Sequence, residues 1–320
     1  MNELIETERK YVKDLQFVIR NYKQPLVKLG ILSSQEANDV FLNVEGILEV
    51  SQRLLELLEP QTSLPLRERA IGSIFSDLIH GFNTYVVYCS KQDSSQSVIN
   101  SLLEERKDLK KFIAEVKELP ESRQQDISSF LIKPLQRICR YPLLFKELLR
   151  ELPEDHPDVP NIRDVIASMQ EIISQSNELK RVTDNVNAVV SISESIRYIP
   201  EYYPIRLKLT TGSVQFVAEE TFKEYTAADG VIHMSKPFQT VRAFLFSELL
   251  LVCRKQAPPR GGALPLPRKK KSDEPTHAIK HALPLESVVV WDYQRKSGEH
   301  KDLKHAFSIL RTDVKDKVCI

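Results

Sequence analysis

The sequence predicts a multidomain α + β protein, in which an all-helical part is followed by a sheet-rich part. Two observations predict this order. Only four of the nine glycines lie before residue 197, and β-branched and aromatic runs concentrate after residue 205. Glycine-poor stretches with apolar residues every three to four positions are typical of helices, whereas short apolar runs between turn-like segments are typical of strands. A chain of 320 residues is long enough for two domains.

Composition and motifs exclude several classes of function. The formal net charge of +1 gives no overall field that attracts nucleic acid. The four cysteines form no CxxC pair, and the histidines do not combine with them in ligand spacing, so no metal centre is expected. No glycine-rich phosphate loop or nucleophile motif is present. With no transmembrane-length apolar run or signal peptide, we expect a cytoplasmic protein without a cofactor.

The first 24 residues carry a strong helical pattern that Pro25 is expected to end. Leu4, Tyr11 and Leu15 belong to its apolar stripe. Glu8 lies on or beside that stripe, where a carboxylate is costly unless it is paired. From spacing alone Glu8 is either an edge residue that reaches solvent or a carboxylate that accepts hydrogen bonds from a partner. Three more helices are expected at residues 35–58, 67–91 and 94–118.

The stretch SSFLIKPLQRICRYPLLFKELLREL, residues 128–152, predicts a helix with one buried face, expected to bend at Pro134 and Pro142. Its other stripe mixes hydroxyl, apolar, amide, thiol and cationic side chains, and its members are Ser129, Ile132, Gln136, Cys139, Arg140 and Leu143. Such a mixture suits a surface that meets another protein. The alternative is a partly exposed helix edge.

Residues 161–199 contain neither proline nor glycine and predict one long helix. Asn177, Arg181 and Asp184 share one polar face of it, which is either a plain surface or a binding surface. From Tyr202 onward, short runs of β-branched and aromatic residues indicate strands.

A loop between two of these strands, residues 256–277, is rich in proline and glycine. It carries the basic run Arg268, Lys269, Lys270 and Lys271. This run is either a solvated tether or a finger that contacts anionic membrane lipids.

Two of these stretches resemble a known family. ELIETERKYVKDL (residues 3–15) and SSFLIKPLQRICRYPLLFKELL (residues 128–149) resemble the first and third conserved regions of Dbl-homology (DH) domains, the exchange factors of Rho-family GTPases. RAFLFSELLLVCRK (residues 242–255) is similar to the paired strands of pleckstrin-homology (PH) domains. The resemblance implies an elongated all-α DH helical bundle at 1–190 and a helical connector at 191–204. It also implies a PH-like β-sandwich or barrel at 205–320 that is truncated before its closing helix.

The resemblance also implies a function and a site. The partner would be a Rho-family GTPase, and exchange would require no covalent step, so the protein would not be an enzyme in the covalent sense. Glu8 would accept hydrogen bonds from switch I, while Arg140 and Asn177 would engage switch II. Ser129, Gln136 and Asp184 match peripheral contacts, Cys139 shares their stripe, and Ile132 resembles Rac-directed members. A catalytically silent DH–PH scaffold and a membrane-binding adaptor are the alternatives.

Overall fold

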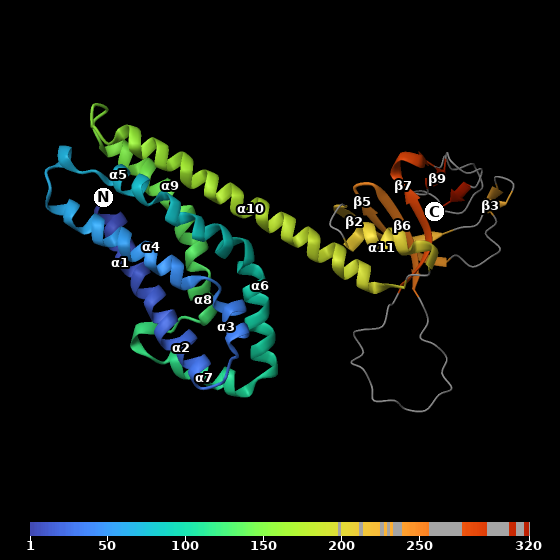
Figure 1. The fold of residues 1–320 in the computed structure, drawn as a ribbon, viewed down its shortest axis with the longest axis horizontal. Helices are drawn as coiled ribbons and strands as arrows, with labels where there is room; N and C mark the ends of the chain where they lie inside the picture. Colours follow the sequence, from blue (N-terminus) through green and yellow to red (C-terminus); the bar gives the residue numbers. More distant parts are fainter. Residues whose placement is uncertain are drawn as a thin grey trace. The chain divides into compact units, whose positions relative to one another are not determined.

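The computed structural model describes residues 1–197, 200–210, 214–224, 227–228, 231–232, 239–255, 277–292, 307–311 and 317–319. The chain divides into two compact units, Met1–Val182 and Thr183–Ile320. The first unit is helical and the second contains the strands (Figure 1). The predicted order, a helical part followed by a sheet-rich part, is therefore confirmed.

The first unit is built from α-helices joined by short connections. Its helices are α1 (Asn2–Phe17), α2 (Gln24–Lys28), α3 (Ser34–Phe41), α4 (Val44–Leu58), α5 (Ile71–Leu78), α6 (Thr84–Glu105), α7 (Lys107–Lys117), α8 (Ile127–Leu131), α9 (Lys133–Glu151) and most of α10 (Val159–Ser195). A π-helical segment, Val18–Lys23, joins α1 to α2, and the 3-10 segments are Glu59–Ser63, Leu66–Glu68, Ile79–Asn83 and Pro120–Ser122.

Several predicted helix boundaries are wrong, and each error has a local cause. Pro25 does not end the helical stretch, because α1 continues through the π-helical segment Val18–Lys23 into α2, in which Pro25 is the second residue. The helix expected at 35–58 divides into α3 and α4 at Leu42, which has a φ of +52°. The helix α6 runs through the expected gap at residues 92 and 93 and ends before Arg106, whose side chain donates to the Ile31 carbonyl at 2.6 Å.

The two prolines of the 128–152 stretch have different effects from those expected. The chain breaks at Ile132, between α8 and α9, so Pro134 lies in the first turn of α9 and causes no bend inside a helix. Pro142 lies inside α9 and is buried. Burial against neighbouring helices offsets the hydrogen bond that Pro142 cannot make.

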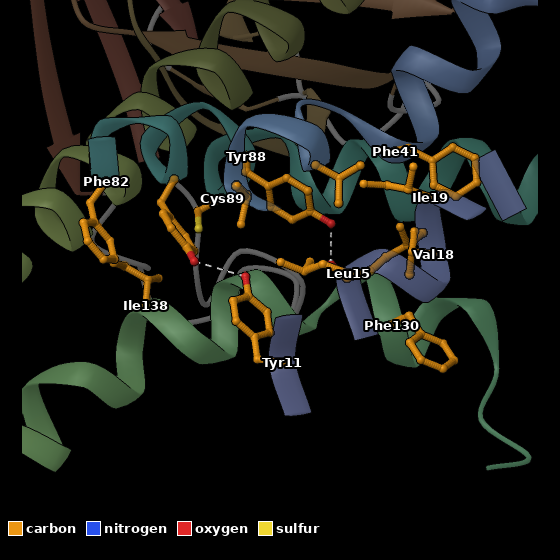
Figure 2. Close-up of a cluster of buried hydrophobic side chains, with 14 of the residues drawn as sticks. Tyr11, Leu15, Val18, Ile19, Phe41, Phe82, Tyr88, Cys89, Phe130 and Ile138 are labelled. Carbon is orange, nitrogen blue, oxygen red and sulfur yellow. Dashed lines mark hydrogen bonds between the residues drawn. The ribbon is translucent and has the colours of Figure 1, made fainter. Parts of the chain in front are cut away.

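Aromatic side chains form the centre of the first unit. Phe75 stacks on Phe82 at a centroid distance of 5.7 Å, and Phe82 in turn meets the edge of Tyr141 at 5.6 Å. The Tyr88 hydroxyl donates to the Leu131 carbonyl at 2.8 Å, which satisfies a polar group inside the core. Figure 2 shows this core with Tyr11 of α1, Cys89 of α6 and Ile138 of α9 among its side chains. Packing of this kind holds α1, α6 and α9 as one rigid group.

The start of α10 lies directly against α5. A Cβ atom added to Gly72 would meet the backbone nitrogen of Ile162 at 2.6 Å, so only glycine fits there. The Asp158 carboxylate accepts hydrogen bonds from the backbone N–H groups of Gly72 (2.6 Å) and Ser73 (3.0 Å). These contacts satisfy donors that the first turn of α5 leaves without helical partners.

The second unit contains a five-stranded sheet in the order β1-β7-β6-β5-β2, in which only β1 runs parallel to its neighbour. Its strands are β1 (Ile196–Arg197), β2 (Phe216–Glu224), β5 (Gln239–Phe246), β6 (Leu249–Lys255) and β7 (His277–Pro284). A second sheet has the order β10-β9-β8, formed by β8 (Val288–Asp292), β9 (Phe307–Arg311) and β10 (Lys317–Cys319), and β3 (Ala227–Ala228) pairs with β4 (Val231–Ile232). The 3-10 segments are Pro200–Tyr202 and Leu285–Ser287.

One expected strand of the second unit is a helix. Residues Tyr203–Thr210 form α11, with Pro204 at the second helical position, where a proline is tolerated. Leu209 of this helix is buried in a core with Phe244 and Leu251 of the sheet. No helix within the described ranges is long and apolar enough to cross a membrane.

Candidate functional site

The mixed stripe of α8 and α9 lies at the surface of the first unit. Gln136, Cys139 and Arg140 are exposed, and so is Leu143, with 59% of its area accessible. Ser129, on α8, is also exposed, whereas Ile132 at the break between the helices is half-buried. A polar stripe with a large exposed apolar side chain is the composition expected of a protein-binding surface.

Arg140 is paired with a carboxylate of α1. Its Nη2 donates to Oε1 of Glu3 at 2.6 Å, and the two side chains are 50% and 56% exposed. An exposed ion pair contributes only about 0–1 kcal/mol to stability. Both groups can therefore change partners at little cost. We call the surface formed by Glu3, Gln136, Cys139, Arg140 and Leu143 the Glu3–Arg140 face.

Glu8 does not lie on this face, so its expected outward position is wrong. Its side chain is fully buried, and Oε2 accepts hydrogen bonds from Arg137 Nε and the Tyr141 hydroxyl, both at 2.8 Å. The physical reason is the spacing itself: Glu8 is on the apolar stripe of α1, and a buried cation from α9 compensates its charge. The acid of α1 that is exposed and paired with Arg140 is Glu3, five residues earlier, which the sequence reasoning missed.

A signal for this arrangement was present in the sequence. Arg137 precedes Tyr141 by four residues and therefore shares the buried face of α9. A buried arginine requires a buried carboxylate, and Glu8 is the acid on the apolar face of α1. Glu3 lies off that face and is free to reach solvent.

Burial shapes the protonation of the groups around Glu8. Burial, reinforced by the neighbouring Glu8 carboxylate, raises the pKa of Tyr141 well above its usual range. Tyr141 therefore remains a hydroxyl donor to Glu8 at neutral pH.

Asn177 lies on α10 and is exposed. Three residues later, Lys180 is paired with Asp93 of α6. One turn earlier on α6 is Cys89, whose pKa is raised to about 12 by burial and by the nearby Cys139 thiol. Cys139 of the Glu3–Arg140 face and the Asn177 segment thus border the same two turns of α6. The first unit brings these two predicted regions together.

The other predicted site residues fall elsewhere. Asp184 is exposed on the part of α10 that belongs to the second unit. Arg268, Lys269, Lys270 and Lys271 lie outside the described residues. Their assignment to anionic lipids stays a prediction.

The fold and this surface define a class of protein. The first unit is a rigid helical bundle whose outer face carries an exchangeable ion pair, polar side chains and an exposed leucine. This combination is typical of a module that acts by binding another protein.

The particular family follows from the comparison with known domains. The chain belongs to the RhoGEF domain family, whose model matches residues 1–177. This range contains the Glu3–Arg140 face and ends at Asn177. The resemblance to DH domains inferred from the two motifs is therefore confirmed.

Similar proteins extend the likeness beyond the first unit. The myosin-M heavy chain of Dictyostelium discoideum is 30% identical over 256 residues, which is 79% of this chain and 14% of that protein. Rho guanine nucleotide exchange factor scd1 of Schizosaccharomyces pombe is 31% identical over 194 residues, which is 61% of this chain and 21% of that protein. The chain thus spans a small part of these relatives.

Solved structures show the same fold. The linker-DH/PH domains of p115-RhoGEF superpose with a TM-score of 0.77 at 16% identity, covering 100% of this chain and 90% of that one. The DH/PH fragment of PDZRHOGEF, solved in complex with human RhoA, gives a TM-score of 0.71 at 16% identity and covers 99% and 86%. The predicted fold class, a DH bundle followed by a PH-like sheet region, is confirmed.

Proposed function

We propose that this chain is a guanine nucleotide exchange factor that accelerates GDP release from a Rho-family GTPase, with a Rac-type GTPase as the preferred partner. The observation that carries the proposal is the exposed Glu3–Arg140 pair, which lies within the matched RhoGEF domain. An exposed acid and an exposed cation, each satisfied by the other in the free protein, are ready to be redistributed onto a partner.

The mechanism follows from a difference in binding. An exchange factor that binds the nucleotide-free GTPase more tightly than the GDP-bound form lowers the barrier to GDP release by that difference. No covalent step is needed. Glu3 takes the role first assigned to Glu8 and accepts hydrogen bonds from switch I. Arg140 and Asn177 engage switch II and draw it away from the Mg²⁺ and phosphates of the GTPase.

Most of the surrounding side chains are uncharged and contribute apolar area or neutral hydrogen-bonding groups. Leu143 offers exposed apolar area, and Ser129 and Gln136 offer neutral hydrogen-bonding groups at the periphery. Cys139 is a small exposed group on the Glu3–Arg140 face. Asp184 is assigned a further peripheral contact. The preference for a Rac-type partner comes from Ile132, because an isoleucine at this position resembles Rac-directed members of the family. Selectivity is a difference of affinities spread over several contacts, of which this half-buried side chain is one.

Release of a fluorescent GDP analogue from purified Rac-, Rho- and Cdc-type GTPases tests this proposal. The wild-type chain is expected to accelerate release, most strongly from Rac. Glu3→Gln, Arg140→Gln and Asn177→Ala are each expected to reduce the rate of GDP release that the chain catalyses by about tenfold or more. A tenfold reduction corresponds to a loss of about 1.4 kcal/mol of transition-state stabilisation.

A second exposed ion pair of α1 provides a matched control. The side chains of Arg9 and Glu59 are 45% and 46% exposed, and Arg9 Nη2 lies 2.8 Å from Glu59 Oε1. The substitution Arg9→Gln therefore removes a comparable ion pair outside the Glu3–Arg140 face. This variant is expected to retain wild-type exchange. Failure of the wild-type chain to accelerate release from any of the three GTPases would contradict the proposal.

Membrane recruitment is a separate proposal from the sequence. A cytoplasmic protein with the basic run Arg268 to Lys271 is expected to bind anionic vesicles peripherally. Sedimentation with phosphatidylserine vesicles, comparing the wild type with a variant in which all four residues are alanine, tests it. Equal sedimentation of both proteins would rule out a role for the run.

A further inference from the structure

We infer that Arg137 is a positioning residue for nucleotide exchange: it anchors the first two turns of α1 to α9 and thereby places Glu3 beside Arg140. This inference rests on the proposed function. Arg137 belongs to α9, one helical turn before Arg140, but its side chain is directed into the bundle and is only 5% exposed. It therefore acts through α1 and not by touching a partner.

The Arg137 guanidinium donates hydrogen bonds to three residues at the beginning of α1. Nε donates to Glu8 Oε2 at 2.8 Å, Nη1 donates to the Thr7 hydroxyl at 2.9 Å, and Nη2 donates to the Leu4 carbonyl at 3.3 Å. Its guanidinium also lies over the Tyr141 ring, 4.6 Å from the centroid. A planar group with donors in fixed directions can hold three separate acceptors at once, which a lysine ammonium cannot do in the same geometry.

These contacts lead directly to Glu3. The Thr7 hydroxyl, which accepts from Arg137, donates to the Glu3 carbonyl at 2.7 Å. The next residue after Glu3 is Leu4, whose carbonyl is bound by Arg137 itself. The two backbone carbonyls that follow the Glu3 Cα are thus tied to α9, that of Glu3 through Thr7 and that of Leu4 directly.

The position of Glu3 depends on this anchor. Glu3 lies in the first turn of α1, and its exposed pairing with Arg140 contributes only about 0–1 kcal/mol, which is too little to fix the two helices relative to each other. The buried contacts of Arg137 with Thr7, Leu4 and Glu8 are the ones that hold this part of α1 against α9.

Two ion pairs therefore link α1 to α9, and their arginines are one helical turn apart on α9. The inner pair, Glu8 and Arg137, is buried and fixed, while the outer pair, Glu3 and Arg140, is exposed and exchangeable. The inner pair sets the register of the two helices. The outer pair presents the acid and the cation to the GTPase in that register.

Arg137→Lys tests the inference, because it keeps a cation beside Glu8 but loses the three-acceptor geometry. Exchange rates are measured for the wild type, Glu3→Gln, Arg137→Lys and the double variant. In the wild-type background Glu3→Gln is expected to slow exchange by about tenfold; in the Arg137→Lys background, which is itself slower by a similar factor, it should slow exchange by less than about twofold. Additive effects of the two substitutions would overturn the inference, although the proposed function would stand.

A measurement that does not depend on nucleotide exchange separates the positioning role of Arg137 from the proposed function. Amide hydrogen exchange at residues Ile5 to Arg9 is expected to rise in Arg137→Lys, while the amides of α4 keep their protection. The matched control is Arg106→Lys, since Arg106 likewise joins a carbonyl (Ile31) and a carboxylate (Glu36), each at 2.6 Å, but holds other elements. This control should leave both α1 protection and nucleotide exchange unchanged.

Each outcome has a distinct meaning. A wild-type chain without exchange activity refutes the proposed function, and the positioning role with it. An active wild type whose α1 protection is the same in Arg137→Lys refutes the positioning role alone. Loss of exchange in Arg106→Lys equal to that in Arg137→Lys would reduce the effect to general destabilisation and would also refute it.

Discussion

Removing the buried carboxylate of Glu8 should destabilise the helical unit far more than removing the whole ion pair. In Glu8→Leu, Arg137 keeps the Thr7 hydroxyl and the Leu4 carbonyl as partners but has no counter-charge, and its side chain is 95% buried in the wild type, since only 5% is exposed. An uncompensated buried charge costs about 3–5 kcal/mol. For a unit of this size, Met1–Val182, each kcal/mol lowers Tm by about 2–4 °C, so the expected loss is about 6–20 °C.

The double variant Glu8→Leu/Arg137→Leu removes both charges and fills the space with apolar groups. Replacing a buried ion pair in this way is close to neutral in free energy. Thermal unfolding of the full chain, followed by circular dichroism at 222 nm, measures the helices. Fluorescence of Trp291, on β8 of the second unit, serves as an internal control that should not shift. A single variant as stable as the wild type, or a double variant less stable than the single one, would refute the reasoning.

Three further predictions concern other parts of the fold. Gly72→Ala forces a Cβ to within 2.6 Å of the α10 backbone and should cost more than about 3 kcal/mol in urea unfolding, whereas Gly30→Ala, in open space with a φ of +69°, should cost only about 1–2 kcal/mol. Maleimide at pH 8 should label the exposed Cys139 well before the buried Cys89, whose pKa is raised to about 12, and labelled protein should lose exchange activity while Cys139→Ser resists the reagent. Hydrogen bonds from the N-cap serine of α3 lower the pKa of Glu36. Because this folded-state pKa lies below the unfolded value of about 4.3, the carboxylate stabilises the fold above that pH, and the stability advantage of the wild type over Glu36→Gln should disappear as the pH falls through the folded value.

Much of the fold could be predicted because helical periodicity is a local property. The long helix α10 and the two-sided character of α9 follow from residue spacing alone. The boundaries were less accessible, because distant contacts decide them. At the break after α3, the side chain of Asn43 donates to the Thr84 hydroxyl at 2.8 Å. The two residues are 41 positions apart, so no local sequence pattern could predict this contact.

The site illustrates the same limit. The cation, the amide and the exposed stripe could be named from the sequence, since they lie off the apolar faces of their helices. The acid could not be chosen by motif alone, because Glu3 and Glu8 stand in the same short segment. Burial separates them: Glu8 has a buried arginine opposite it, and Glu3 has an exposed one. A search for the buried partner of Arg137 would have identified Glu8 as structural.

The most direct test of the account is the affinity of the chain for a Rac-type GTPase with and without bound GDP, measured by isothermal titration for the wild type and for Glu3→Gln/Arg140→Gln. We expect the wild type to bind the nucleotide-free GTPase at least about 100-fold more tightly than the GDP-bound form, a difference of about 2.7 kcal/mol. The double variant should lose most of that difference. Equal affinities of the wild type for the two forms, or an unchanged preference in the double variant, would contradict a role of the Glu3–Arg140 face in nucleotide release.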